Sequence, residues 1–331
     1  MLELAFTARD LAVTRLAYSP LWEVVTSRRL LTSATARPLH RRWADRARPR
    51  LAAAGLGTGL LADLIPERGY LPDFLNPPPA STTPSPRADR ALDAELAVLA
   101  RSTPEQIRAD LERLEHWSPA VHAFHQDPAA VLPHLLAELR GYWEVALAPH
   151  WPRLRAVLEG ELLHQSRRFA TEGPAAVLRG LHPGVEWCSE TLTLRHYTCA
   201  AGSRELSGRG LLLVPSAFVG PAKVLMVNRP AEVVQLCYPS RGVGVLWEQA
   251  TAEVPEAVAA VLGRSRALLL AELAAPASTT ELSHRTGMSA GGISQHLTAL
   301  RAAGIVSSQR LGRSVLYQRT QLADSLLAAA G

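Results

Sequence analysis

The side chains best suited to contact nucleic acid lie near the C-terminal end of the chain. Ile293, Leu297 and Leu300 form an apolar stripe with helical spacing. Gln295 and Thr298 lie opposite this stripe, where they would face a partner. Gln can pair bidentately with adenine, and Ser or Thr can bond phosphate or either base type. The candidate contacts of this helix are Ser289, Ala290, Gly291, Gly292, Ser294, Gln295, His296, Thr298 and Arg301.

Three arginines belong to a second short stretch. Residues 305–310 and 314–319 each have strand-like composition, and Leu-Gly-Arg joins them, so the sequence predicts a β-hairpin. Arg313 lies at its tip, and Arg310 and Arg319 flank it. The guanidinium fork matches phosphate geometry. We therefore expect these arginines to contact phosphates, with Arg313 at the minor groove.

Local signals predict the helices that must position these residues. Ser278 and Glu281 form a capping box, in which each side chain bonds the other residue's backbone N–H. It starts a short helix over roughly 279–286, which ends at Gly287. Ser289 then caps the next helix. Two short helices joined by a glycine turn indicate a helix-turn-helix.

Flanking patterns complete the module. Apolar residues over 258–273 predict one amphipathic helix before the pair, and residues 320–330 predict a last short helix. Gly304 suits the left-handed end of the helix that begins after Ser289. Residues 255–331 therefore predict a winged helix-turn-helix domain.

These stretches resemble the ArsR/SmtB family of winged-helix repressors. The matching segments are LGRSRALLLAEL, TTELSHRTGMS, ISQHLTALRAAGIV and RLGRSVLYQRT. The resemblance implies that the helix after Ser289 enters the major groove, that the wing touches the minor groove or backbone, and that the protein binds DNA as a dimer. Gly291 and Gly292 depart from the family pattern, because longer polar side chains are common there.

Metal sensing is a known property of that family, but this chain lacks the usual ligands. The best-known site is a Cys-x-Cys pair, and Ser278 and Thr280 hold those positions here. The last helix, which supplies His and acidic ligands in the other site, offers only Asp324. Three histidines, His116, His122 and His125, lie close together in the sequence, but their spacing fits no usual metal-ligand pattern. We expect no metal and no other cofactor.

The rest of the chain predicts an α+β fold, mostly α. The expected parts are an N-terminal helical segment (1–75), a Pro-rich linker or loop (76–90), a helical region (91–183) and a small β-rich subdomain (184–250). Short apolar runs, including 211–214 and 243–246, define the β-rich part. Asp127-Pro128 is a helix-start signal.

Residues 1–250 also predict one functional unit. DLAVTRLAYSPLWEVV, RGLLLVPSAF and YPSRGVGVLWE are similar to an uncharacterised domain that precedes ArsR-type winged helices in actinobacterial regulators. That similarity implies no ligand or activity.

Charge separates the ends of the chain from its middle. Of 331 residues, 47% are hydrophobic, which excludes a wholly disordered chain. Lys223 is the one lysine, so nearly all cations are arginine. Residues 1–50 hold ten Arg against four acids and 255–331 hold seven against four, whereas 51–254 are net acidic. The middle is therefore not expected to be a DNA surface.

The sequence indicates a soluble cytoplasmic protein. It has no secretory signal, no apolar run long enough to span a membrane and no disulfide framework. Cys188, Cys199 and Cys237 are either inert or part of a thiol sensor. All the Trp and Phe residues precede the winged helix, where they would pack a core or line an apolar effector site.

We therefore expect a homodimeric DNA-binding repressor with an effector-sensing or dimerisation domain, and not an enzyme. An alternative is an enzyme or small-molecule-modifying domain with an appended winged helix. Against it stands the absence of any recognised catalytic motif in its required context. A further alternative is a winged helix that docks a partner protein and has no operator.

Overall fold

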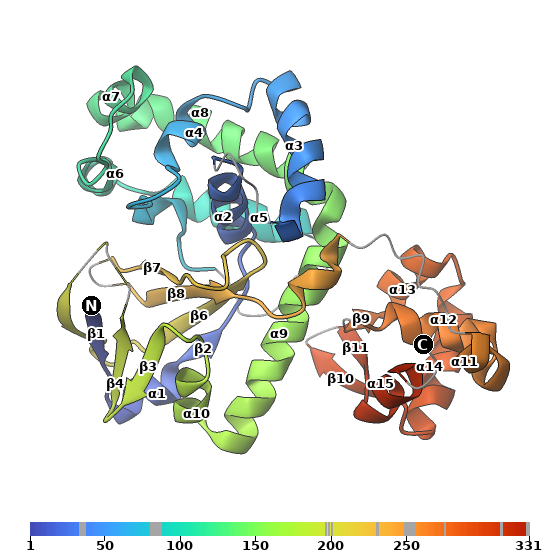
Figure 1. Cartoon of the computed structure of the whole chain (residues 1–331). Coiled ribbons are helices and arrows are strands. Elements are labelled where there is room, and N and C mark those ends of the chain that lie inside the picture. The colour runs from blue at the N-terminus through green and yellow to red at the C-terminus, as the bar shows by residue number, and fades with distance from the viewer. Residues whose placement is uncertain are drawn as a thin grey trace. The chain divides into compact units, whose positions relative to one another are not determined.

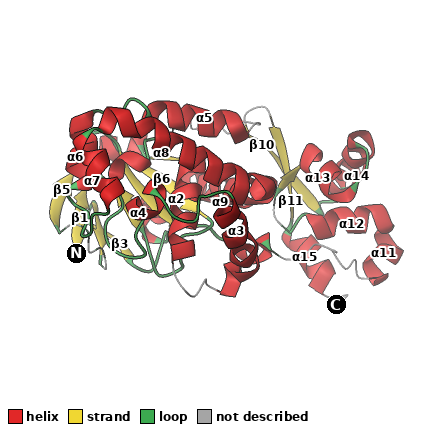
Figure 2. Cartoon of the chain, turned by 90° about the horizontal axis from the view of Figure 1, so that it is seen from above, coloured by secondary structure: helices red, strands yellow, loops and turns green. Residues whose placement is uncertain are grey.

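The structure is a computed structural model that describes residues 1–32, 38–79, 88–195, 197, 199, 201–229, 232–247, 256–274, 276–311 and 314–328. The chain divides into two compact units. Unit 1 comprises Met1–Trp151 and Glu161–Arg241, and unit 2 comprises Pro152–Gly160 and Gly242–Gly331. Helices predominate and the strands form small sheets, so the fold is α+β and mostly α (Figures 1 and 2).

Helices make up most of unit 1. In chain order they are α1 (Ala8–Val13), α2 (Pro20–Thr32), α3 (Arg41–Ala53), α4 (Leu60–Leu64), α5 (Ala88–Leu99), α6 (Pro104–Leu111), α7 (Pro119–Gln126), α8 (Pro128–Tyr142), α9 (Trp151–Glu172) and α10 (Pro174–Arg179). Residues Pro152–Gly160 of α9 are assigned to unit 2. Short 3-10 helices lie at η1 (Pro38–His40), η2 (Asp73–Leu75) and η4 (Ala148–His150), and η3 (Trp143–Leu147) is a short π-helix. Helices α6, α7 and α8 each begin with a capping side chain followed by proline, which fixes their starts. The Asp127-Pro128 signal is confirmed, because Asp127 accepts from the Ala130 N–H.

Eight strands of unit 1 form two four-stranded sheets. The strands are β1 (Leu2–Ala5), β2 (Arg15–Leu16), β3 (Val185–Cys188), β4 (Thr191–Leu194), β5 (Gly202–Glu205), β6 (Leu211–Ser216), β7 (Leu225–Val227) and β8 (Val234–Pro239). Their orders are β3-β4-β1-β5 and β2-β6-β8-β7. Both sheets thus combine strands from the two ends of unit 1.

The first strand of the chain is a central strand. Leu4 of β1 lies opposite Leu192 in the antiparallel pair with β4 and beside Arg204 in the parallel pair with β5. The prediction that residues 1–75 are helical is therefore wrong at β1 and β2. Leu2 and Leu4 are buried while Glu3 and Ala5 are less so, an alternation that is too short to stand out in the sequence.

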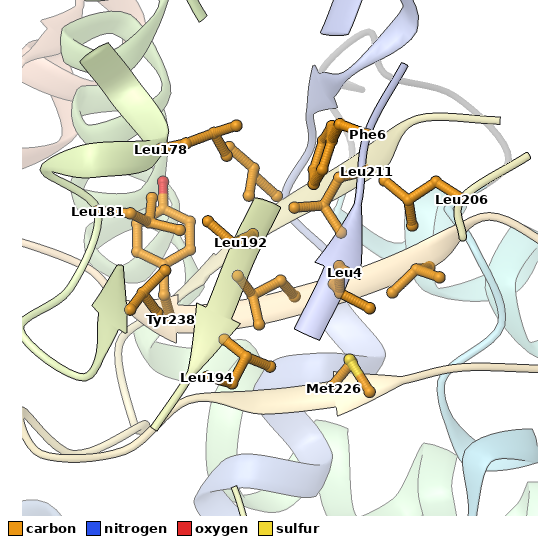
Figure 3. Packing of buried hydrophobic residues seen from close by; sticks show 14 of the residues in the cluster. Leu4, Phe6, Leu178, Leu181, Leu192, Leu194, Leu206, Leu211, Met226 and Tyr238 are labelled. Carbon is orange, nitrogen blue, oxygen red and sulfur yellow. The ribbon is translucent and has the colours of Figure 1, made fainter. Parts of the chain in front are cut away.

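Strand β6 is buried on both faces, which explains its unbroken apolar run. Leu211 and Leu213 pack into the cluster between the two sheets, together with Leu4 and Leu192 (Figure 3). Leu212 and Val214 point the other way and pack with Trp22 of α2. Parallel strands buried on both faces carry continuous rather than alternating apolar residues. Unit 1 is therefore layered as sheet, sheet and helices.

Two further predictions need correction or a closer description. Of the predicted linker or loop at 76–90, residues 76–79 lie outside helices and strands, and Asn76 is fully buried, with its backbone oxygen accepting from Gln235 Nε2 at 2.7 Å. Residues 88–90 already belong to α5, and residues 80–87 lie outside the described residues. The apolar run Val243–Leu246 forms the 3-10 turn η5 instead of a strand.

Four tryptophans of unit 1 pack into its core. Trp22, Trp43, Trp143 and Trp151 are all at least 95% buried, and the Trp143 and Trp151 ring centroids lie 4.8 Å apart. Trp22 Nε1 donates to Gln235 Oε1 at 3.0 Å and Trp43 Nε1 to the Ala146 oxygen at 2.9 Å. These side chains belong to the buried core of the fold.

Unit 2 contains the C-terminal helices and a three-stranded sheet. Its elements after η5 are α11 (Glu256–Leu262), α12 (Arg264–Glu272), β9 (Ala277–Ser278), α13 (Thr279–Thr286), α14 (Ala290–Ala302), β10 (Val306–Leu311), β11 (Ser314–Arg319) and α15 (Gln321–Ala328). The sheet order is β10-β11-β9. The single helix predicted over 258–273 is in fact two, because Gly263 adopts a φ of +82° between α11 and α12.

In the part of the chain that the structure describes, no helix is both long and apolar enough to cross a membrane.

Candidate nucleic-acid interface

Helix α14 begins and ends at side chains and glycines that the sequence predicts. The Ser289 hydroxyl accepts from the Gly292 N–H at 3.2 Å, which satisfies one free donor of the first turn. At the other end Gly304 has a φ of +70°, and the Ile305 N–H bonds the Leu300 oxygen at 3.0 Å. Both predicted ends of α14 are confirmed.

The turn before α14 fixes the angle between α13 and α14. Helix α13 starts at the Ser278–Glu281 capping box, in which both reciprocal bonds are present. Gly287 follows it with a φ of +71°, a conformation that favours glycine. The Ser283 hydroxyl then donates to the Met288 oxygen at 2.6 Å. This bonding makes the helix-turn-helix a preformed unit.

A compact apolar core lies beneath α14. Ile293, Leu297 and Leu300 are at least 98% buried and pack with residues of α12, α13 and β10. The predicted apolar stripe is thus the buried face of the helix, and the residues opposite it are exposed.

The exposed face of α14 is polar and nearly free of charge. Ser294, Gln295 and Thr298 are exposed, as predicted from the helical wheel. Gln295 makes no side-chain hydrogen bond to another described residue, so both ends of its amide are available. The Thr298 hydroxyl donates to the Ser294 backbone oxygen at 2.8 Å and keeps its acceptor sites. Ala299 is also exposed and was missed by the sequence interpretation, although its i+4 spacing from Gln295 is a usable signal.

The first turn of α14 presents backbone rather than long side chains. Ser289, Ala290 and Gly291 are exposed, and Gly292 is half-buried. A Cβ on Gly291 would meet nothing within 4 Å, so packing inside the protein does not require glycine there. The free N–H groups and positive dipole end of a helix attract anions, and here Ala290 and Gly291 place no long side chain beside them, although the Ser289 hydroxyl already bonds the Gly292 N–H.

His296 lies between the two faces of the helix. It is half-buried, whereas its neighbours Gln295 and Thr298 are exposed. Its position is closer to the core than to the exposed face, as the helical wheel predicts.

Strands β10 and β11 form the predicted hairpin. They pair antiparallel from Val306 opposite Arg319 to Leu311 opposite Ser314, and β9 adds a short edge strand that the sequence did not predict. Arg310 is exposed near the end of the hairpin. Arg313, the predicted tip residue, lies outside the described residues.

Two arginines of the predicted interface have partners within unit 2. Arg301 Nη1 donates to Ser308 Oγ at 3.2 Å, which connects the end of α14 to β10. Arg319 Nε lies 3.0 Å from Asp324 Oδ1 of α15, and its side chain is 22% exposed. Arg319 is thus less available to phosphate than the sequence suggests.

Ser278, at one of the two positions that hold cysteine in the ArsR/SmtB pattern, is engaged in the cap of α13. The Ser278 hydroxyl accepts from the Glu281 N–H at 3.3 Å and donates to its carboxylate at 3.0 Å. Within the described ranges, no group of three or more His, Cys, Asp and Glu side chains is arranged to hold a metal ion. His122 and His125 instead pack against Trp117, with ring centroids 5.0 and 4.9 Å away.

The three cysteines are unpaired and lie in different surroundings. Cys188 is exposed, Cys199 is half-buried and Cys237 is buried. Burial raises the pKa of the Cys237 thiol, which keeps it protonated and inert.

Comparison with known proteins identifies the C-terminal helices. Residues 264–308 match the family model of the bacterial regulatory protein, arsR family, which covers α12, α13, α14 and the start of the hairpin. No curated protein and no solved structure matches the chain. The C-terminal part of the chain is therefore an ArsR-family domain, which indicates a DNA-binding transcription regulator.

Proposed function

We propose that the protein is a homodimeric transcriptional repressor that binds operator DNA through unit 2 and is controlled through unit 1. The exposed polar face of α14, held on a capped helix-turn-helix of the ArsR family, carries this proposal. Double-stranded DNA is the partner, the cytoplasm is the place of action, and neither a cofactor nor a catalytic step is involved.

Helix α14 supplies the contacts with the major groove. The unbonded amide of Gln295 pairs with an adenine edge, and Ser294 and Thr298 bond neighbouring bases or phosphates. The bare first turn at Gly291 lets the backbone N–H groups approach a phosphate closely. Arg310 and Arg313 of the hairpin add phosphate contacts that position the domain without reading sequence.

A dimer explains how so few contacts define an operator. One α14 offers a single long unbonded amide, whereas two helices related by a twofold axis read two half-sites about 34 Å apart. Unit 1 supplies the dimer interface, the effector site or both. Repression follows when the bound dimer covers a promoter.

Binding to the DNA upstream of the protein's own gene tests the proposal. In fluorescence anisotropy at fixed salt, we expect the full chain to bind this DNA at least 100-fold more tightly than a shuffled duplex. Light scattering should give the mass of a dimer. Equal affinity for both duplexes would contradict the proposal and favour a protein-docking winged helix.

Two glutamine variants separate base recognition from general effects. Gln295→Ala should cost about 1–3 kcal/mol on the preferred site and much less on shuffled DNA. Gln126→Ala changes an exposed glutamine of α7 in unit 1 and should leave both affinities unchanged. Equal losses on the two duplexes would assign Gln295 to positioning alone.

A further inference from the structure

A cavity of about 320 Å³ opens in unit 1 where its helices meet both sheets. Its lining comes from η2, the segment after α6, β5, β7 and the segment before β5. The lining residues are Asp73, Arg113, Tyr197, Cys199, Arg204, Met226 and Asn228. The volume is at the lower end of small-molecule sites, which run from about 300 to 1,000 Å³. A peptide or a nucleic acid would not fit.

Polar and charged groups dominate this lining. Arg113 Nη1 bonds Asp73 Oδ2 at 3.1 Å and the Tyr70 hydroxyl at 2.8 Å, and its guanidinium carbon lies 3.6 Å from the Tyr70 ring centroid. The Tyr70 hydroxyl donates in turn to Asp110 Oδ1 at 2.8 Å. Arg113 is therefore held in one orientation before any ligand arrives, which lowers the entropy cost of binding.

Arg204 brings a second positive charge that no carboxylate of the described residues neutralises. With its amide oxygen turned toward Arg204, Asn228 accepts from Nη1 at 2.8 Å and from Nε at 3.3 Å. This neutral partner orients the guanidinium without cancelling its charge. Among the lining residues the two arginines face one carboxylate, Asp73, so the lining itself carries one positive charge in excess. Asp110, which bonds Tyr70, and Arg229, which acts on Asp110, are a further acid and base outside the lining.

The remaining lining residues suit the body of a small ligand. The Tyr197 hydroxyl lies 3.5 Å from the Met226 backbone oxygen, and Met226 gives the site one buried apolar wall. Two arginines can bind the acid group of a small organic acid, while the Tyr197 hydroxyl and the apolar wall at Met226 can contact its carbon skeleton. Neutral apolar molecules match this lining poorly, and none of its residues is a tryptophan.

We propose that this cavity binds a small organic anion, held by Arg113 and Arg204 through a carboxylate or a phosphate, as the effector of the repressor. The inference rests on the proposed function and replaces the apolar effector beside tryptophan that the sequence suggested.

The test measures anion binding to the full chain with phosphate, malonate and benzoate as probes. Experiments at pH 8 keep Asp73 ionised, because burial and the neighbouring Asp110 raise its pKa to about 6. We expect at least one probe to raise the melting temperature saturably, beyond sodium chloride at equal ionic strength. Phosphate alone would indicate a phosphate ester, and malonate or benzoate a carboxylate.

Matched arginine variants assign the binding to the cavity. Arg204→Gln should raise the dissociation constant of the active probe at least tenfold. Arg209→Gln removes the same charge from an exposed residue outside the cavity and should change it less than twofold. Melting curves without anion show whether each variant is folded. No saturable shift with any probe, or equal binding by Arg204→Gln, would overturn the site.

Anisotropy on operator DNA separates this proposal from the previous one. A saturating probe should change the DNA dissociation constant at least threefold in wild type and not in Arg204→Gln. Anion binding with unchanged DNA affinity would overturn the effector role. If the chain binds anions but no DNA, the proposed repressor function is wrong and the anion site stands. If it binds DNA but no anion, the anion site is wrong and the repressor function stands.

Discussion

The contacts inside unit 1 and the contacts inside unit 2 join residues at different distances along the sequence. In unit 2, the caps of α13 and α14 join residues three apart, and β10 and β11 are neighbours along the chain. In unit 1, β1 pairs with strands 186 to 200 residues later, and Asp10 accepts from the Gly210 N–H. The winged-helix part of unit 2, from α12 to β11, is thus specified locally, whereas unit 1 closes only when both of its ends are present.

The long-range contacts of unit 1 converge on helix α2 and strand β6. Glu23 accepts from the Ala217 N–H at 3.2 Å, and the hydroxyls of Thr26 and Ser216 lie 3.0 Å apart. β2 pairs with β6 just before α2 begins. The stretches DLAVTRLAYSPLWEVV and RGLLLVPSAF, which lie far apart in the sequence, therefore meet in one core.

The largest expected effect comes from removing a side chain at this convergence. Trp22→Ala should lower the free energy of unfolding of unit 1 by about 3–5 kcal/mol, because it leaves a cavity and removes the bond to Gln235. Trp117→Ala, at a half-buried tryptophan, should cost clearly less. Urea unfolding followed by circular dichroism measures both, and equal losses would argue against α2 as the centre of unit 1.

A second prediction concerns pH and the buried carboxyl groups of unit 1. Burial raises the pKa of Glu95 to about 8, although the Leu21 N–H and the Ser19 hydroxyl both bond it at 2.9 Å. Between its ordinary pKa of 4.5 and about 8, the unfolded chain loses this proton while the folded chain keeps it. Stability should therefore fall as pH rises through this window, by up to about 1.4 kcal/mol per pH unit.

Glutamine variants isolate the contribution of Glu95. Glu95→Gln cannot ionise and should flatten the dependence of unfolding free energy on pH between pH 5 and 8. Some slope should remain, because burial also raises the pKa of Glu23 to about 8. Glu67→Gln, at an exposed position, should leave the slope as in wild type. Parallel slopes for all three proteins would show that Glu95 is ionised in the folded state.

The difference between contacts of neighbouring residues and contacts of distant residues also explains which features could be predicted from the sequence. The start of α13 at Ser278, the N-cap at Ser289 and the left-handed Gly304 depend on neighbouring residues, so their pattern was sufficient. The exposed and buried faces of α14 followed from spacing alone. Gly263 was misjudged because the apolar spacing continues through it, although its positive φ separates α11 from α12.

Features that depend on distant residues could not be predicted in this way. Four residues of β1 carry too little pattern to reveal their partners, and the Pro-rich context of Asn76 hides its burial. The cavity between Arg113 and Arg204 joins positions 91 residues apart with no shared motif. The Arg319–Asp324 ion pair is close in sequence, but it spans the turn from β11 to α15 and matches no helical spacing.

A third prediction tests whether the caps of unit 2 act locally. Ser278→Ala should cost about 0.5–2 kcal/mol, because it leaves the Glu281 N–H without its partner. Hydrogen exchange should then speed up about 2- to 30-fold across residues 279–286, with no change in β1 or β6. Ser265→Ala, at an exposed serine of α12, serves as the control. Faster exchange in unit 1 would show that the two units unfold together.

The smallest expected effect concerns Arg319 of unit 2 and tests whether this arginine contacts DNA phosphates. Asp324 is 59% exposed and competes with DNA phosphates for the Arg319 guanidinium. Exposed ion pairs contribute about 0.2–1 kcal/mol, so Asp324→Asn should tighten binding to any duplex by about 1.4- to 5-fold. The slope of log affinity against log salt should steepen by up to about 1, because one more phosphate is neutralised. Asp127→Asn removes an acid of unit 1 while keeping an oxygen that can cap α8, and it should change neither value. An Asp324→Asn protein with wild-type slope would place Arg319 outside the interface and leave Arg310 and Arg313 as the arginines of the hairpin that contact DNA.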